Sequence, residues 1–527
     1  MSIGQSTDPT LPLIESKHFP NTLEQYHTLK GHIETFKITF NYSINMYLGP
    51  IHHPAIGIRI PEILLKGILS AFKKRNTVGT LMLSFVRETA PEYVINAPPG
   101  VYDITRGHTG TSIRKYMTLA HDVAEEMGVQ VEIEADHITV TSPSKAVKRI
   151  VGVKVEYGLS DEELKESMDY IRTEIEEAVQ TGYVDFFTID TCEMVRLEVD
   201  SMDSRSVEER FKDTVPKEEA ENLMKRYIGR NFVFIGSSGR PFHLNFSKID
   251  VMRLALKYLD SLDLALKMYR MICEEMKKIR RPFGIEVAFD ELPELTKEKD
   301  LYFYLRELWD RGLSIDFIAP NIGFKKRKDY EGDLVELRDR VERLSSIARS
   351  FGTLLSFHSG SGSGPFTGKG KGVYEALLEA TGENLKYKVS GVYIELLFKI
   401  MESYPKGTRP RNLYERVFED MYNYLKDCVE EERELSSPLL KRMIKEYEDR
   451  GKPTNSEEPI FKYFSFISLN LRDSSGRRYL REEIVNMYEE DENFREKFDK
   501  EVERLTLHMI EGLNFIDNVK RLSWWTK

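Results

Sequence analysis

Short apolar runs alternate with longer amphipathic stretches through most of the chain. The runs are rich in β-branched and aromatic residues and end in polar side chains, whereas the stretches between them repeat apolar residues with the period of a helix. This alternation is typical of stacked βαβ units, in which helices cover a parallel sheet. The predicted strands are residues 81–86, 129–135, 184–190, 232–236, 283–289, 314–320, 353–359 and 387–396.

Eight strands is the number that closes a TIM-like (β/α)8 barrel, and this is the fold class that we predict. An apolar run does not reveal which strand it pairs with, so some of the eight can belong to an insertion. The helices are marked more clearly. Residues 161–181 begin with a capping box formed by Ser160 and Glu163 and continue with a helical repeat of Leu164, Met168, Ile171 and Ile175.

The two ends of the chain differ from this central pattern. Residues 1–60 are interrupted by prolines and contain one strand-like run, residues 36–42, so we expect an N-terminal arm or cap. Residues 61–407 form the predicted barrel domain. Residues 408–527 are dense in Glu, Lys and Arg, with one strand-like run at 460–469, and predict a mainly helical C-terminal extension whose charged runs face solvent.

Composition narrows the class of protein. The 527 residues are 41% hydrophobic and 31% charged, which is typical of a globular chain. A formal net charge of -10 offers no positive field for nucleic acid or an anionic membrane, so a small-molecule substrate is expected. We expect a cytoplasmic protein for three reasons. The three cysteines are scattered, no run of about 18 apolar residues occurs, and the sequence shows no signal peptide. The oligomeric state is left open, and a homo-oligomer is possible.

Carboxylates and histidines gather where the predicted strands end, which is where barrel enzymes place their catalytic groups. Asp136 and His137 end the second strand, and both side chains suit a divalent metal ion. Because neighbours on an extended strand point to opposite faces, the two can share one site only if a turn or bulge intervenes. Asp190 with Glu193 ends the third strand, and Asp290 with Glu291 follows the fifth, where the pair can simply begin a helix.

Glu286 is surrounded by apolar residues in the fifth predicted strand. A carboxyl group there is costly to bury unless it is paired, metal-bound or protonated. That environment suits an acid/base residue. Alternatively, strand alternation turns Glu286 into the barrel interior to meet an Arg or Lys.

His358 opens a glycine-rich segment, FHSGSGSGPFTGKGKG, whose backbone N–H groups can approach a ligand. It does not match the P-loop pattern, so a sugar or carboxylate contact is one interpretation and a flexible surface loop is the other. Asn321 follows the sixth strand and can supply an oxygen ligand or bind a hydroxyl. The basic residues Lys325, Lys326 and Arg327 come next, and they can hold a carboxylate or simply face solvent.

Taken together, IEVAFDELPELT, DFIAPNIGF and FHSGSGSG resemble the tagaturonate/fructuronate epimerase family, metal-dependent barrel enzymes. The resemblance extends to about residue 440 and is strongest over 283–364. It implies a 3-epimerase that interconverts tagaturonate and fructuronate with a divalent cation, whether Mn, Co, Ni, Zn or Fe. The cation would acidify the C3 proton beside the C2 ketone and stabilise the enediolate.

The resemblance gives the residues named above provisional roles. Asp136 and Glu286 are the predicted acid/base pair, because inversion needs two such groups on opposite faces of C3. His137, Asn321 and His358 are the predicted metal ligands. Asp190, Lys325, Ser359 and Ser361 are the predicted substrate-binding residues.

Three other functions stay open. A metal-dependent sugar isomerase or aldolase would use the same enediolate chemistry. Two carboxylates on barrel strands can also hydrolyse glycosidic bonds, although three tryptophans offer few rings for stacking against sugars. A non-catalytic sugar-binding protein would bind its ligand without exchanging carbon-bound hydrogen.

Overall fold

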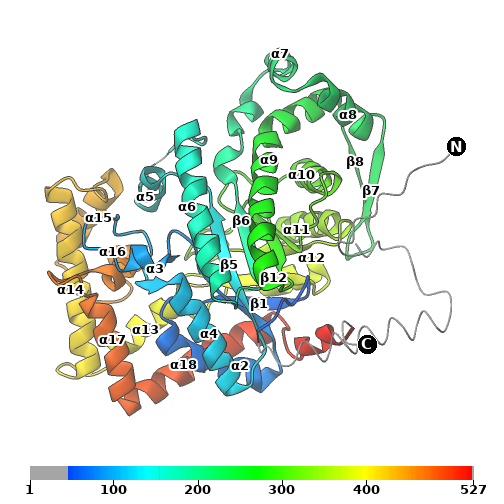
Figure 1. Ribbon diagram of the computed structural model, residues 1–527. Helices are drawn as coiled ribbons and strands as arrows, with labels where there is room; N and C mark the ends of the chain where they lie inside the picture. Colours follow the sequence, from blue (N-terminus) through cyan, green and yellow to red (C-terminus); the bar gives the residue numbers. More distant parts are fainter. Residues whose placement is uncertain (1–44, 154, 525–527) are drawn as a thin grey trace. The chain divides into compact units, whose positions relative to one another are not determined.

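The computed structural model describes residues 45–153 and 155–524. Its centre is a closed barrel of eight parallel strands in the order β1-β12-β11-β10-β9-β6-β5-β2. Helices surround the strands (Figure 1), so the predicted TIM-like α/β barrel is confirmed. The barrel strands are β1 (His53–Gly57), β2 (Gly79–Ser84), β5 (Val131–Thr139), β6 (Phe186–Asp190), β9 (Gly284–Ala288), β10 (Phe317–Ala319), β11 (Leu354–Phe357) and β12 (Leu385–Val389).

One predicted barrel strand is wrong and another was missed. Residues 232–236 lie in β7 (Asn231–Ile235), which pairs antiparallel with β8 (Pro241–Asn245) in a separate hairpin. The barrel is closed instead by β1, which pairs with β12 and β2 and begins before the boundary expected at residue 60. Strand propensity favours the wrong segment, because β7 is NFVFI whereas β1 is HPAIG and contains Pro, Ala and Gly. Burial distinguishes the two strands. All five residues of β1 are buried, whereas β7 is mostly exposed.

Two further strand predictions fall partly or wholly in helices. Residues 387–396 begin in β12 but continue into α13 (Val392–Glu402), because the chain turns at Ser390 and Gly391. Residues 460–469 are helical and include α16 (Pro459–Phe464). The strand-like run at 36–42 lies outside the described residues.

Most helices connect successive strands. The capping box predicted at Ser160 and Glu163 is present at the start of α6, and α9 begins with a second one at Ser247 and Asp250. These boxes satisfy backbone N–H groups that would otherwise be unpaired. The helices up to residue 402 are α2 (Pro61–Arg75), α3 (Glu92–Ile95), α4 (Ile113–Met127), α5 (Pro143–Ile150), α6 (Asp161–Gln180), α7 (Ser204–Thr214), α8 (Lys217–Tyr227), α9 (Lys248–Ile279), α10 (Glu298–Asp310), α11 (Leu334–Arg349), α12 (Val373–Thr381) and α13.

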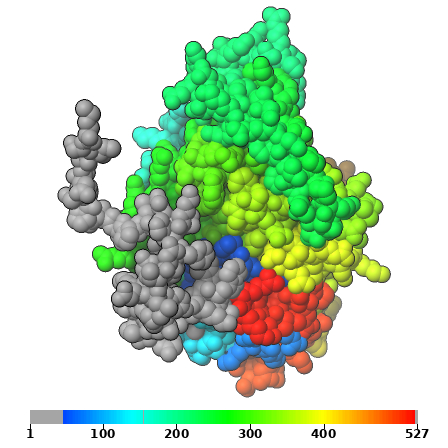
Figure 2. Space-filling view, turned by 90° about the vertical axis from the view of Figure 1, so that its right-hand side faces the viewer, coloured from blue at the N-terminus to red at the C-terminus, as the bar shows by residue number. Residues whose placement is uncertain are grey.

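The described residues after 408 are helical and pack against the barrel. They comprise α14 (Arg409–Glu430), α15 (Pro438–Asp449), α16, α17 (Tyr479–Glu490), α18 (Glu492–Gly512) and 3-10 turns at Ser465–Asn470 and Asn518–Trp524. The first four of these helices gather beside α3, α5 and α13 (Figure 1). The final residues, red in Figure 2, lie beside the blue segment that contains β1, and Asn518 donates to the carbonyl of His52.

The segment 437–481 reaches the loops that follow the barrel strands. Arg478 and Arg481 donate to the carbonyls of Ile95 and Thr109, which lie after β2. Ser437 and Tyr463 donate to those of Val151 and Ile150, which lie after β5. This part of the extension therefore covers loops at the carboxyl end of the barrel. In the described part of the chain, no helix is long and apolar enough to cross a membrane.

Candidate active site

A bulge in β5 brings Asp136 and His137 to the same site. The pairing of β5 with β6 shifts register between Ala135 and Ile138. His137 has a φ of 46°, a left-handed conformation that non-glycine residues adopt only when their surroundings require it. The bulge that the sequence required for these neighbours is therefore present, at the carboxyl end of the strand.

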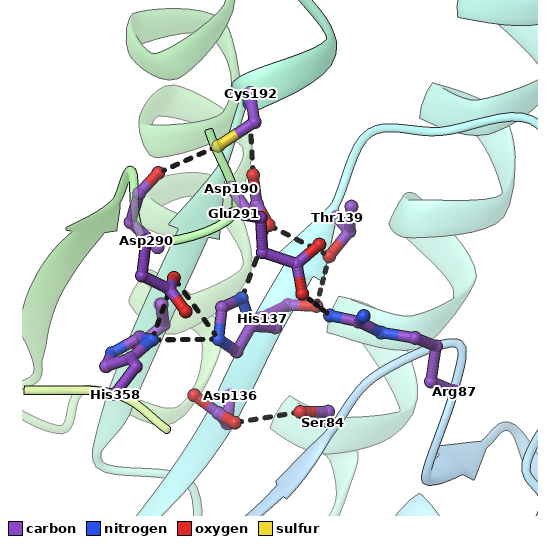
Figure 3. Close-up of polar contacts among 12 residues, drawn as sticks. Ser84, Arg87, Asp136, His137, Thr139, Asp190, Cys192, Asp290, Glu291 and His358 are labelled. Carbon is purple, nitrogen blue, oxygen red and sulfur yellow. Dashed lines mark hydrogen bonds and ion pairs between the residues drawn. The ribbon is translucent and has the colours of Figure 1, made fainter. Parts of the chain in front are cut away.

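His137, Asp290 and His358 form a compact cluster at this end of the barrel (Figure 3). One potential ligand atom from each side chain lies within 4.8 Å of the other two. Nε2 of His137 is 3.0 Å from Nδ1 of His358, which is 3.0 Å from Oδ1 of Asp290. Both histidines are buried and Asp290 is partly buried. Three strands that are distant in sequence thus supply three ligand-type atoms to one point.

Two carboxylates lie behind the histidines. Asp190 Oδ2 is 3.3 Å from Nδ1 of His137, and Glu286 Oε1 is 2.5 Å from Nε2 of His358. The other oxygen of Asp190 accepts the backbone N–H of Cys192 at 3.0 Å. Both carboxylates are fully buried. They hold the two rings from the side opposite to the cluster.

This arrangement fits a divalent metal ion. If each outer ring nitrogen donates its proton to the carboxylate behind it, Nε2 of His137 and Nδ1 of His358 both present lone pairs to each other. With Asp290, three acceptors then converge with no proton between them. Bonds of about 2.1 Å at angles of about 90–110° separate neighbouring ligand atoms by about 3 Å. Two of the spacings here are 3.0 Å, and the third, from His137 to Asp290, is 3.9 Å. A carboxylate behind each ligating histidine is also usual at metal sites.

The same carboxylates favour protonated histidines when no cation is bound. Burial alone lowers the pKa of His358, but Asp290 and Glu286 outweigh it and raise the pKa to about 9. For His137, burial also lowers the pKa, whereas Asp136, Asp190 and Asp290 raise it above its ordinary value. The cluster therefore attracts positive charge, which a proton or a metal ion can supply.

The barrel interior below the cluster contains a buried ionic network. Nζ of Lys388 lies 2.6 Å from Asp136 Oδ1, 2.6 Å from Glu134 Oε1 and 3.0 Å from Glu286 Oε1. Lys386 is 2.7 Å from Glu134 and 3.4 Å from Glu286. Burial raises the pKa of Glu286, but the charges of Lys388, Lys386 and His358 hold it well below its ordinary value. Glu286 therefore faces the interior and is ionised.

Sequence reasoning missed Lys386, Lys388 and the place of Asp290 in the cluster. The two lysines could have been found from the alternation of charged and apolar residues along the strands. In LKYKV the two lysines share one face of β12, and in VEIEAD the three acids share one face of β5. Complementary charges at every second position of buried strands predict an ionic barrel interior. Asp290 does not begin a helix, because α10 starts at Glu298.

Asn321 lies on the loop after β10 and is bound to backbone. Its Nδ2 donates to the carbonyl of Leu292 at 2.6 Å, and its Oδ1 accepts the N–H of Gly323 at 2.8 Å. Both polar atoms of the side chain are thus engaged in holding this loop against the loop after β9. Its assignment as a metal ligand stays a prediction.

The glycine-rich segment is organised around Lys369. Its ammonium group donates to the carbonyls of Lys325 at 2.6 Å, Ser359 at 2.7 Å and Ser361 at 3.1 Å. A Cβ at Gly360 would lie 2.7 Å from the carbonyl oxygen of Lys388, so that glycine permits close packing. Ser359 and Ser361 therefore stand in an ordered loop, and their predicted role in substrate binding is not tested.

The three basic residues after Asn321 have different surroundings. Lys326 pairs with Glu291 at 3.1 Å, and Glu291 also binds Arg87 at 2.7 Å (Figure 3). Lys325, the predicted substrate-binding residue, is exposed, and its nearest acid is Glu331 at 3.9 Å. Arg327 is only partly exposed. These residues do not act as one surface patch.

Comparison with known proteins identifies the family. The model of the tagaturonate epimerase family (UxaE) matches residues 150–509, which is more than half of the chain. The chain belongs to the tagaturonate epimerase family. The recognised resemblance, the isomerase class and the ketohexuronate epimerase function are therefore confirmed. The match extends past residue 440 into the helical extension, and it begins after Asp136 and His137.

Solved structures agree with this fold. The glycerol complex of fructuronate-tagaturonate epimerase UxaE from Cohnella laeviribosi superposes with a TM-score of 0.61 at 15% identity, covering 92% of this chain and 85% of that one. The native crystal structure of the same enzyme gives 0.59 at 16% identity, covering 90% and 83%. Identities this low support the fold alone. No curated protein matches the sequence significantly.

Proposed function

We propose that the chain interconverts tagaturonate and fructuronate by inverting the carbon at which they differ, C3 counted from the carboxylate, with a divalent cation as cofactor. The observation that carries this proposal is the convergence of His137, Asp290 and His358 at the carboxyl end of the barrel. Membership in the epimerase family supports the substrate class.

His137, Asp290 and His358 are the proposed ligands of the cation. When bound, a divalent cation would polarise the carbonyl of the substrate and stabilise negative charge that develops on its oxygen. The inverted carbon is not adjacent to this carbonyl, so the cation would not acidify the proton of that carbon as the enediolate route expected. Asp190 and Glu286 orient the two imidazole rings and keep the facing nitrogens unprotonated. Nitrogen and oxygen donors of this kind accept Mn, Co, Ni, Zn or Fe.

Asp136 and Glu286 are the proposed acid/base pair. One group removes a proton from the substrate and the other returns one, so the overall reaction gains and loses none. Both carboxylates contact the ammonium group of Lys388. That group can therefore pass a proton between them and restore the starting state after each turnover.

Proton NMR in heavy water tests the proposal directly. The metal-loaded protein, given fructuronate, should consume it and produce tagaturonate. Chelation should abolish both, and addition of one divalent ion per chain should restore them. His137→Ala should lose metal and activity together, whereas His243→Ala, which alters an exposed histidine on β8, should change neither.

Other outcomes would point to different chemistry. Cleavage of the carbon chain would indicate an aldolase, and exchange at C1 with formation of an aldose would indicate an isomerase. Full activity of the metal-free protein would contradict the proposed cofactor. Binding without exchange at any carbon would leave a sugar-binding protein.

A further inference from the structure

Arg327 is a guanidinium group without a counter-ion in the described structure. It lies on the loop after β10, with a φ of 56°, and its side chain is only partly exposed. Within residues 45–153 and 155–524 it forms no ion pair or hydrogen bond. Burial and the charge of Arg59 lower its pKa to about 10, so it remains protonated at neutral pH. An unpaired cation held at this cost needs an explanation.

A second arginine lies beside it. Arg59 follows β1, and Gly391 follows β12, the neighbouring strand. A Cβ at Gly391 would be 3.6 Å from both Arg59 Nη1 and Arg327 Nη2. The absent side chain of Gly391 therefore leaves room where the two guanidinium groups approach each other.

His108 contributes an unpartnered buried nitrogen to the same region. Its side chain is 6% exposed, and Nδ1 has no hydrogen-bond partner in the described structure. Burial, followed by the charges of Arg59, Arg87 and Arg327, lowers the pKa of His108 well below its ordinary value, so the ring is neutral. A neutral imidazole can still donate one N–H to an anion.

The nearby acids are already paired. Glu88 accepts from Arg59 at 2.8 Å, and Glu291 is held by Arg87 and Lys326. Glu395, on α13, lies 3.3 Å from Lys462 and 3.5 Å from Lys399. Glu395 and Glu88 act on Arg327 through their charges, but neither makes an ion pair or hydrogen bond with it in the described structure, so its N–H donors are left for a carboxylate.

The C-terminal extension forms a wall of this region. Arg327, Gly391 and Glu395 line a small cavity together with Phe398, Ser456, Phe461, Lys462 and Ser465. The ring of His108 packs against that of Phe466, with centroids 4.6 Å apart. The site is thus enclosed between the barrel loops and residues 456–466, where lower polarity strengthens charge-assisted hydrogen bonds.

We propose that Arg327, with Arg59 and His108, binds the carboxylate of the sugar acid and so selects hexuronates over neutral ketohexoses. This assignment rests on the proposed function, because it takes the substrate from there. Arg87 connects the two regions, since it lies near His108 and binds Glu291, the residue next to Asp290 of the cluster. A substrate with a carbonyl near one end and a carboxylate at the other could place the carbonyl at the metal cluster and the carboxylate at Arg327.

The test compares Arg327→Gln with wild type on fructuronate and on the ketohexose that carries CH2OH in place of the carboxylate. Loss of a charge-assisted contact should raise the KM for fructuronate by about 10- to 100-fold. The kinetics with the ketohexose, the metal content and the melting temperature should stay unchanged. Arg327→Lys should recover part of the loss, because it retains charge but not the fork of donors. Lys328→Gln, an exposed charge on the same loop, is the matched control.

Calorimetric titration with fructuronate separates this proposal from the proposed function. If wild type turns over fructuronate and Arg327→Gln has the same KM, the carboxylate site is wrong and the function stands. An equal loss on both sugars would also overturn it, because Arg327 would then act through the fold. If wild type binds fructuronate without turnover and Arg327→Gln abolishes binding, the function fails and the carboxylate site stands.

Discussion

A single buried carboxylate, Glu286, shows how the barrel interior supports charge. An isolated ionised carboxylate would be strongly destabilised in such a site. Here Glu286 Oε1 contacts Lys388 and His358, and Oε2 lies 3.4 Å from Lys386. Neighbouring cations offset the desolvation, and the same contacts connect the ionic network to the candidate metal cluster.

Glu286→Gln separates two roles for this residue. If Glu286 belongs to the acid/base pair, kcat should fall by about 100- to 10,000-fold while the protein still binds one metal ion. The rate of conversion of fructuronate to tagaturonate and metal analysis measure the two effects. Glu294→Gln, an exposed residue of the same segment, is the control. Near-normal turnover at saturating metal, with weaker metal binding, would show instead that Glu286 acts only by orienting His358.

At the scale of elements, the loop between β11 and α12 depends on one lysine. Lys369 is fully buried and donates to three backbone carbonyls, from this loop and from the loop after β10. A segment rich in glycine pays a large entropic cost when it is ordered. The interactions of Lys369 help to offset that cost next to His358.

Lys369→Met should loosen both loops. The carbonyl of Lys325 also accepts the N–H of Lys328, but loss of the ammonium group removes the donor from those of Ser359 and Ser361. The free energy of unfolding should therefore fall by about 1–3 kcal/mol. Chemical denaturation measures this change, and amide hydrogen exchange of residues 357–372 should become faster. Lys371→Met, two residues along and exposed, should change stability by less than about 0.5 kcal/mol. Equal stability of the two variants would refute the structural role of Lys369.

At the scale of the whole molecule, the described part of the C-terminal extension is integral to the barrel. Helix α18 packs against α2, and Arg481 at the start of α17 makes two 2.9 Å contacts with Glu62 in α2. Arg481 also donates to Thr109 and Thr111 in the loop after β2. The extension thus joins the outer helices to the loops around the candidate site.

Arg481→Met should weaken this attachment. Loss of Arg481 leaves Glu62 with Lys115 as its remaining partner at 2.6 Å, so the free energy of unfolding should fall by about 1–3 kcal/mol at neutral pH. Burial raises the pKa of Glu62, but Arg481 and Lys115 lower it below its ordinary 4.5. The contribution of the pair is therefore present above pH 4.5 and is lost as the pH falls through the folded-state pKa.

Denaturation of wild type and variant across pH checks both statements. The difference in stability should shrink below the ordinary pKa of Glu62. Arg477→Met, whose side chain is 60% exposed, should cost less than about 1 kcal/mol. A stability difference that does not depend on pH would show that Arg481 contributes packing rather than charge.

Much of the fold was predictable because its signals are local. The capping box at Ser160 and the strand residues 284–288 follow from patterns within a few positions. The sequence did not predict that β1, rather than β7, belongs to the barrel, because strand pairing depends on contacts between distant segments. The candidate site was also only partly predictable. His137 and His358 could be selected because they follow strand-like runs, whereas the contact of Lys388 with Asp136 and Glu286 is known only from the structure.

The sequence by itself determined the barrel class, the family and the residue types available for chemistry, since periodicity and motifs are written along the chain. Only the tertiary structure decided which of those residues meet. It placed Asp290 with the two histidines, turned Glu286 towards lysines and left Arg327 unpaired among the described residues. The physical reason is that a barrel brings together strand ends separated by tens to hundreds of residues, and no local pattern records those distances.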